Sequence, residues 1–247
     1  MSIFSEDIPK TTPSLEWFFY FVIELICFNF PKVDKRREFM RDGELHIIST
    51  DKQPPQQLAE IISRIHHEVD FIHLREKSKT AREVVELVKL LVNENVPLSK
   101  IIINDRVDIA VASNVKGVQL AYHSLPVDCV KRNFTNLTIG CSVHAIEEAR
   151  FAEKKGADYV VCGHIYSTSS KTGLIPKGLE LLKNVSESVS IPVIAIGGIT
   201  PGNTGDVIGS GAKGIAVMSG IFEAKDPLLA ARSYRSCLAK ESFYLEP

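Results

Sequence analysis

Two short segments near the end of the chain have the composition of an anion-binding site. Segments 191–200 and 214–221 each contain a run of Val and Ile, typical of a strand buried on both faces, and each run ends in glycine or serine. Glycine lets backbone N–H groups approach a ligand closely, and a helix that starts there favours a negative charge. Two such endings predict the phosphate site of a (β/α)8 barrel. The alternative is that Gly197 and Gly198 only form a tight turn.

Polar side chains also follow the other apolar runs, where a barrel places its active site. Three of them are cations that could bind a second anionic group such as a carboxylate. Two others are neutral and extend the same polar ring. The five predicted binding residues are Arg75, Lys77, Lys171, Asn104 and Ser142.

His123 is the predicted catalytic residue, because an imidazole can take and return a proton near neutral pH. A purely structural histidine is the alternative. His73 should share the face of Arg75 by strand alternation, whereas His144 and His164 are expected to support walls or loops. A metal site that uses Asp105 stays open, although no second carboxylate stands at a matching strand end.

The elements that must position these residues alternate regularly from Leu45 onward. Apolar runs predict eight strands, and amphipathic segments predict a helix after each of them. Eight units in about 200 residues predict an α/β fold, a (β/α)8 TIM barrel, with a doubly wound open sheet as the rival. The predicted strands are 45–50, 71–76, 100–105, 117–122, 138–143, 159–165, 192–196 and 214–218.

The first part of the chain does not follow this pattern. Segment 17–30 is apolar, but it is shorter than the roughly 20 residues that span a bilayer. The basic residues that follow it would suit a helix at a membrane surface. We favour the simpler interpretation, in which Met40 is the natural start. The predicted organisation is a non-barrel extension over residues 1–43 and a single barrel domain over residues 44–247.

Composition excludes several classes of function. The 247 residues carry a formal net charge of −1 and no basic face, so we expect no nucleic-acid partner and no membrane contact for the barrel. The five cysteines form no Cys-x-x-Cys pair, which argues against a zinc site or a disulfide framework. The expected compartment is reducing, and we predict a cytoplasmic protein.

Seven segments together resemble the thiamine phosphate synthase superfamily, and the resemblance runs from about Leu45 to Ala239. The segments are His-Leu-Arg-Glu-Lys (73–77), Ile-Asn-Asp-Arg-Val-Asp (103–108), Gly-Val-Gln-Leu (117–120), Gly-Cys-Ser-Val-His (140–144), Gly-His-Ile-Tyr-Ser-Thr-Ser-Ser-Lys (163–171), Gly-Gly-Ile (197–199) and Val-Met-Ser-Gly-Ile (217–221). The resemblance implies a phosphate site made by Gly197, Gly198, Met218 and Ser219. It implies a ligand-binding loop that contains Thr168, Ser170 and Lys171.

The superfamily contains two activities, and the segment after the fourth strand decides between them. Thiamine phosphate synthases join a pyrimidine diphosphate to a thiazole phosphate with Mg²⁺. Their metal site pairs an aspartate, which corresponds to Asp105, with an acidic residue at the position where this chain has Ser124. Tyr122 would also fill space that the pyrimidine needs. Leu-Ala-Tyr-His-Ser (120–124) instead resembles the TenI-type thiazole tautomerases, in which the histidine transfers the proton.

The leading prediction is therefore an isomerase, a thiazole tautomerase of thiamine biosynthesis that forms the aromatic thiazole carboxylate phosphate. We expect no metal and no cofactor, a thiazole phosphate as the small-molecule partner, and a homo-oligomer. The alternatives are a Mg²⁺-dependent thiamine phosphate synthase and a regulator that binds thiazole phosphate without catalysis.

Overall fold

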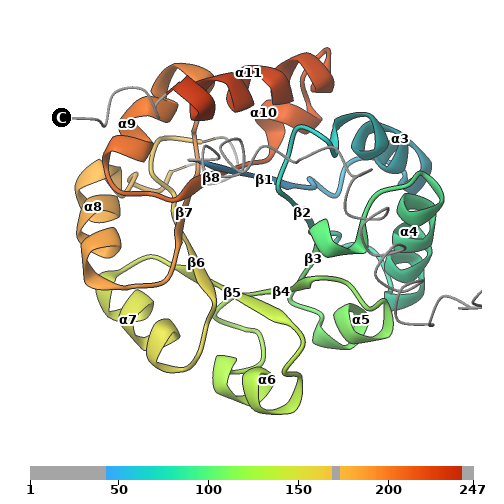
Figure 1. The fold of residues 1–247 in the computed structure, drawn as a ribbon, viewed down its shortest axis with the longest axis horizontal. Coiled ribbons are helices and arrows are strands. Elements are labelled where there is room, and N and C mark those ends of the chain that lie inside the picture. Colours follow the sequence, from blue (N-terminus) through green and yellow to red (C-terminus); the bar gives the residue numbers. More distant parts are fainter. Residues whose placement is uncertain (1–42, 169–172, 241–247) are drawn as a thin grey trace, which may run out of the picture. The chain divides into compact units, whose positions relative to one another are not determined.

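The computed structural model describes residues 43–168 and 173–240, the side chain of the last one excepted. In this part of the chain, eight parallel strands close into a barrel in the order β1 to β8, with helices around them (Figure 1). The (β/α)8 prediction is confirmed, and the open-sheet alternative is wrong. The strands are β1 Glu44–Ile48, β2 Phe71–Leu74, β3 Ile101–Asn104, β4 Gly117–Leu120, β5 Thr138–Val143, β6 Tyr159–Gly163, β7 Val193–Ile196 and β8 Gly214–Val217.

A helix follows every strand, as the sequence predicts, and most elements are one to three residues shorter than expected. The helices are α3 Pro55–Ile65, α4 Ala81–Asn93, α5 Val107–Ala112, α6 Val127–Asn133, α7 Ile146–Lys154, α8 Gly178–Ser188, α9 Thr204–Gly209 and α11 Pro227–Lys240. Three short elements were not expected: the 3-10 turns η1 Leu98–Lys100 and η3 Pro201–Asn203, and the helix α10 Ser219–Phe222.

The strands separate two layers of buried side chains. In β1, Leu45 and Ile47 belong to the large apolar core between sheet and helices, whereas Ile48 belongs to a smaller cluster inside the barrel. This is the alternation of side chains along a strand. Burial of each such aliphatic side chain contributes about 1.5–3 kcal/mol, so the outer layer provides most of the apolar stabilisation.

Arg235 of α11 links the last helix to the first two strands. Its guanidinium donates to the backbone oxygens of Glu68 and Gly43, at 2.9 and 3.0 Å, and pairs with the carboxylate of Asp70. That carboxylate also accepts a hydrogen bond from the backbone N–H of Leu45, at 2.8 Å. One side chain therefore holds three segments at the N-terminal end of the barrel.

The loop after β7 depends on glycine. Gly197 and Gly198 have φ values of 101° and 66°, in the left-handed region that disfavours other residues. A Cβ atom on Gly198 would collide with the backbone oxygen of Ser167, and one on Gly197 would collide with His164. The glycines therefore let this loop pack closely against the loop after β6, in addition to any role in binding an anion.

Several expectations fall outside the described residues. The predicted extension 1–43 is described only at Gly43, and the boundary at residue 43 stays a prediction. Ser170 and Lys171 also lie outside the described residues. Among the helices that the structure describes, none has the length and apolar character to cross a membrane.

Arg235→Met should lower the free energy of unfolding by about 3 kcal/mol, because it removes the guanidinium that pairs with the largely buried Asp70 carboxylate. Urea denaturation measures this value. The control is Arg232→Met on the same helix, since Arg232 pairs with Glu68 at the surface. We expect a loss below about 1 kcal/mol there. Equal losses would contradict the proposed link.

Gly198→Ala should destabilise the fold by about 2–4 kcal/mol, since it combines left-handed strain with a steric collision. The matched control is Gly202→Ala, where the nearest heavy atom would lie 3.9 Å from the new Cβ. Thermal unfolding of both variants tests the difference. If Gly198→Ala melts like the control, the close approach of the two loops is not required.

Candidate active site

Asp105 lies at the centre of the polar rim where the strands end. It directly follows β3, and its Oδ1 accepts a hydrogen bond of 2.6 Å from the hydroxyl of Ser124, beyond β4. The Ser124 Oγ also accepts from the backbone N–H of Ala121, at 2.9 Å. The two loops are therefore fixed to each other through a carboxylate and a hydroxyl.

The backbone of Asp105 is strained in a way that aims its side chain. Its φ is 68°, in the left-handed region, and its N–H donates to the backbone oxygen of Gln119, at 2.8 Å. A residue other than glycine in this conformation costs about 1–2 kcal/mol, and such strain is concentrated at functional sites. We infer that the position of this carboxylate is functionally important.

The two residues before Ser124 are exposed. Tyr122 is 98% exposed, and the expectation that its ring fills the pyrimidine space stays a prediction. His123 is exposed as well, packs edge-on against Tyr122, and has its Nε2 3.8 Å from Oδ2 of Asp105. His123 is therefore a neighbour of the central carboxylate.

Arg75 and Lys77 follow β2 on the same rim. Arg75 is half-buried and Lys77 is exposed, and among the described residues neither side chain has an ion-pair partner. The backbone N–H of Arg75 donates to the hydroxyl of Ser49, at 2.8 Å, which fixes the loop to the end of β1. Two positive charges are thus available for an anion at this end of the barrel.

A buried ion cluster holds the loop that carries these cations. The amine of Lys79 contacts the carboxylates of Glu76 and Asp51, and Asp51 also accepts hydrogen bonds from Ser78. Burial by itself would lower the pKa of Lys79, but its bonds to Glu76 and Asp51 outweigh burial and raise it. Burial by itself would raise the pKa of Asp51, but the hydrogen bonds from Ser78 and Lys79 outweigh burial and lower it. Lys79 and Asp51 therefore stay charged at neutral pH.

The remaining predicted residues lie on neighbouring strands. Asn104 ends β3 in register with Gln119 of β4, and the amide of Gln119 donates to the hydroxyl of Ser142 in β5, at 3.1 Å. Met218 and Ser219 lie at the start of α10, and Thr168 lies in the loop after β6. Gly197 and Gly198 follow β7.

His144 and His164 have the supporting roles that the sequence predicts. The His144 ring contacts the backbone oxygen of Gly163, and Nε2 of His164 lies 3.4 Å from the backbone oxygen of Leu174. Both side chains therefore fix the segment around the end of β6.

Sequence reasoning missed two features of the site. It treated Ser124 as a lost ligand, whereas the serine is the hydrogen-bond partner of Asp105. It also missed His46, which contacts His73 inside the barrel. The available signal for His46 was its place in β1, two residues before Ile48, on the inward face.

Comparisons with known proteins agree on the family. A family model described as "Thiamine monophosphate synthase" matches residues 45–221. The thiamine-phosphate synthase of Pyrococcus furiosus is 37% identical over 193 residues, which cover 78% of this chain and 93% of that protein. The corresponding protein of Chlorobium luteolum is 42% identical over 171 residues, with 66% and 79% covered.

Solved structures point the same way. The thiamine phosphate pyrophosphorylase of Pyrococcus furiosus superposes with a TM-score of 0.69 at 33% identity, covering 82% of this chain and 98% of that one. The 3-hexulose-6-phosphate synthase of Salmonella typhimurium, with a TM-score of 0.64 at 16% identity over 80% and 99% of the two chains, shares the fold alone.

These relatives correct the predicted activity. They are named synthases, which are transferases, so the expectation of a thiazole tautomerase, and of an isomerase, is wrong. That His123 is a catalytic residue stays a prediction, because these comparisons concern the activity and not this side chain. The resemblance to the superfamily is confirmed: the chain belongs to the thiamine monophosphate synthase family.

Proposed function

We propose that this protein is a thiamine-phosphate synthase, which joins a pyrimidine diphosphate to a thiazole phosphate and releases diphosphate. The observation that carries the proposal is the 37% identity to the Pyrococcus furiosus synthase across 93% of that protein. The geometry of the rim is compatible with the proposal, since Tyr122 is exposed and Ser124 donates a hydrogen bond to Asp105.

The thiazole phosphate is assigned to the loops after β7 and β8. Gly197 and Gly198 have left-handed backbone conformations after β7, and Met218 and Ser219 begin the helix that follows β8. Backbone N–H groups in such loops bind phosphate oxygens. We assign Thr168, Ser170 and Lys171, which follow β6 in the sequence, to the same thiazole phosphate site.

The diphosphate is assigned to the opposite part of the rim. Release of diphosphate concentrates negative charge on the leaving group, and fixed cations stabilise such charge. Arg75 and Lys77 provide two positive charges there, Asn104 and Ser142 provide neutral polar groups, and the exposed His123 can add a hydrogen-bond donor.

The family implies Mg²⁺, and the donor atoms present fit it. Among the described residues there is no ready cluster of three His, Cys, Asp or Glu side chains. Magnesium, however, often takes one or two carboxylates and fills its shell with substrate phosphates and water. Asp105 and Ser124 would hold it with a carboxylate and a hydroxyl, and the ion would neutralise diphosphate charge. Assembly into a homo-oligomer and a cytoplasmic location stay predictions.

Asp105→Asn should lower kcat/KM for thiamine phosphate formation by about 10²–10³-fold, because it removes the only carboxylate of this donor set. The assay combines the pyrimidine diphosphate, the thiazole phosphate and Mg²⁺. Asp108→Asn is the matched control, since Asp108 pairs with Arg106 at the surface. Wild-type protein that binds both substrates without forming product would contradict the proposal and favour the regulator.

Arg75→Gln should raise KM for the pyrimidine diphosphate about ten- to a hundredfold, the value of one or two lost charge-assisted hydrogen bonds. KM for the thiazole phosphate should change little. Arg82→Gln, on the exposed face of α4, controls for the loss of one positive charge. An equal rise in both KM values would place Arg75 outside the diphosphate site.

A further inference from the structure

The barrel interior holds four buried polar side chains beside its apolar cluster, whereas barrels of this kind are filled mainly with branched apolar side chains. His46, His73, Gln119 and Tyr159 are all buried there, from strands β1, β2, β4 and β6. None of them is required for the packing of sheet against helix. A buried polar group is expected to have a hydrogen-bond partner, and one without a partner needs an explanation.

Three of these side chains form a relay that starts at Glu44. Oε2 of Glu44 lies 3.1 Å from Nε2 of His46, and Nδ1 of His46 lies 2.9 Å from Nε2 of His73. An ionised carboxylate only accepts hydrogen bonds, so His46 carries its hydrogen on Nε2. Where Nδ1 of His46 accepts from Nε2 of His73, the neutral His73 ring has no hydrogen on its Nδ1, which is left as an acceptor.

Among the buried atoms that have no protein partner in the described residues, three lie on these interior side chains: Nδ1 of His73, Oε1 of Gln119 and Oη of Tyr159. A Cβ atom on Gly140 would collide with both the Gln119 and the Tyr159 oxygen, so both oxygens lie beside this glycine. The Tyr159 ring also lies edge-on to the His73 ring, with 6.4 Å between their centroids.

The protonation states of the cluster make it complementary to water. Burial, and next the neighbouring His46, hold the pKa of His73 well below its usual range, so its Nδ1 accepts. Burial, followed by the charges of Glu44 and Asp158, raises the pKa of Tyr159, so its hydroxyl keeps its hydrogen. Two acceptors and one donor match the two hydrogens and a lone pair of one water molecule, and buried waters typically make about three hydrogen bonds.

We propose that an ordered water molecule is bound at the barrel centre by His73, Gln119 and Tyr159, and that Glu44 and His46 are positioning residues that orient it. The chain continues from the amide of Gln119 to the hydroxyl of Ser142 at the rim. It therefore connects the two ends of the barrel. Only the contact between Ser142 and substrate rests on the proposed function.

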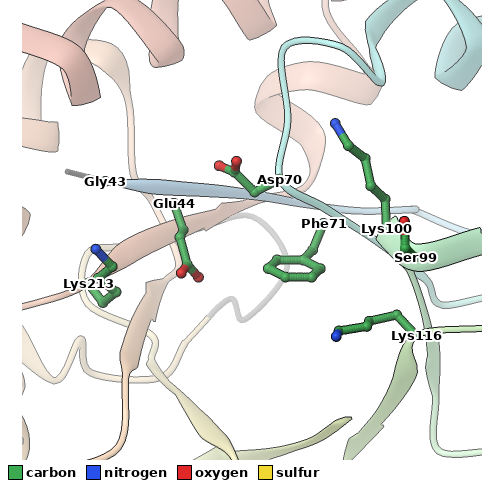
Figure 2. A pocket seen from close by; sticks show the side chains of 8 residues that line it. All are labelled: Gly43, Glu44, Asp70, Phe71, Ser99, Lys100, Lys116 and Lys213. Atoms are coloured by element: carbon green, nitrogen blue, oxygen red, sulfur yellow. The ribbon is translucent and has the colours of Figure 1, made fainter. Parts of the chain in front are cut away.

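Glu44 is the point where this chain meets solvent. It lines a cavity of about 360 Å³ at the N-terminal end of the barrel, together with Phe71 and Lys116 (Figure 2). The side chain of Glu44 is 31% exposed, whereas that of His46 is 2% exposed. A change at Glu44 thus reaches the buried histidines without altering the apolar core.

The tautomers of the two histidines test the relay. In ¹⁵N-histidine NMR spectra at pH 7, the hydrogen-bond geometry predicts hydrogen on Nε2 of both rings and an unprotonated Nδ1 on His73. Glu44→Gln keeps an oxygen acceptor and should leave this pattern intact, whereas Glu44→Leu removes it and should give His73 a mixture of tautomers. An imidazolium at either ring of the wild type, or an unchanged His73 in Glu44→Leu, would overturn the proposal.

Tyr159→Phe tests the water site, because the proposal predicts whether the unfolding temperature falls or rises. If the hydroxyl binds water, its removal lowers the unfolding temperature, and a high-resolution crystal structure of the wild type shows the water that the variant lacks. If the hydroxyl is bare, its removal raises the unfolding temperature, and the proposal fails.

Enzyme kinetics separate this inference from the proposed function. Glu44→Leu should raise KM for the pyrimidine diphosphate several-fold and leave kcat nearly unchanged, while Glu44→Gln should keep both values. Should the wild type form no thiamine phosphate, the proposed function fails, yet the NMR and melting results still decide on the water site. Unchanged KM in Glu44→Leu would contradict the link to Ser142.

Discussion

Closure of the sheet between β1 and β8 is the constraint on which this molecule depends. Residues Glu44–Ile47 pair in register with Gly214–Val217, which leaves no free strand edge among the described residues. Because all eight strands are parallel, closure brings every strand C-terminus to one rim. Arg75, Asp105 and Ser124 follow the consecutive strands β2, β3 and β4, and closure brings the loops after β7 and β8 to the same rim.

Much of the fold could be predicted from the sequence, because strand and helix periodicity are local properties. The runs of Ile and Val at 101–103 and 193–196 are buried as expected, and the glycines at 197 and 198 mark a real departure from ordinary backbone. Side-chain direction in loops was not predictable. Nothing in Tyr-His-Ser shows that the tyrosine points to solvent while the serine turns back to Asp105. That difference led to the wrong activity.

The same limit applies inside the barrel. Alternation predicts that His73 faces inward with Arg75, but the contact with His46 depends on the register between β1 and β2. In that register His73 pairs with Ile48, and His46 pairs with Phe71 one step below. Register is set by packing of the whole ring, so the buried pair becomes visible only in three dimensions.

The bond between Arg235 and Asp70 has a consequence for how the protein is made. It joins residues 165 positions apart, and Arg235 lies within the last helix of the described chain. A ribosome releases the first strands many seconds before this arginine, at roughly 5–20 residues per second. During that time β1 lacks both β8 and its arginine clamp. Until β8 is made, the edge of β1 that β8 later covers stays open even when β1 has paired with β2, and an open edge can pair with another chain.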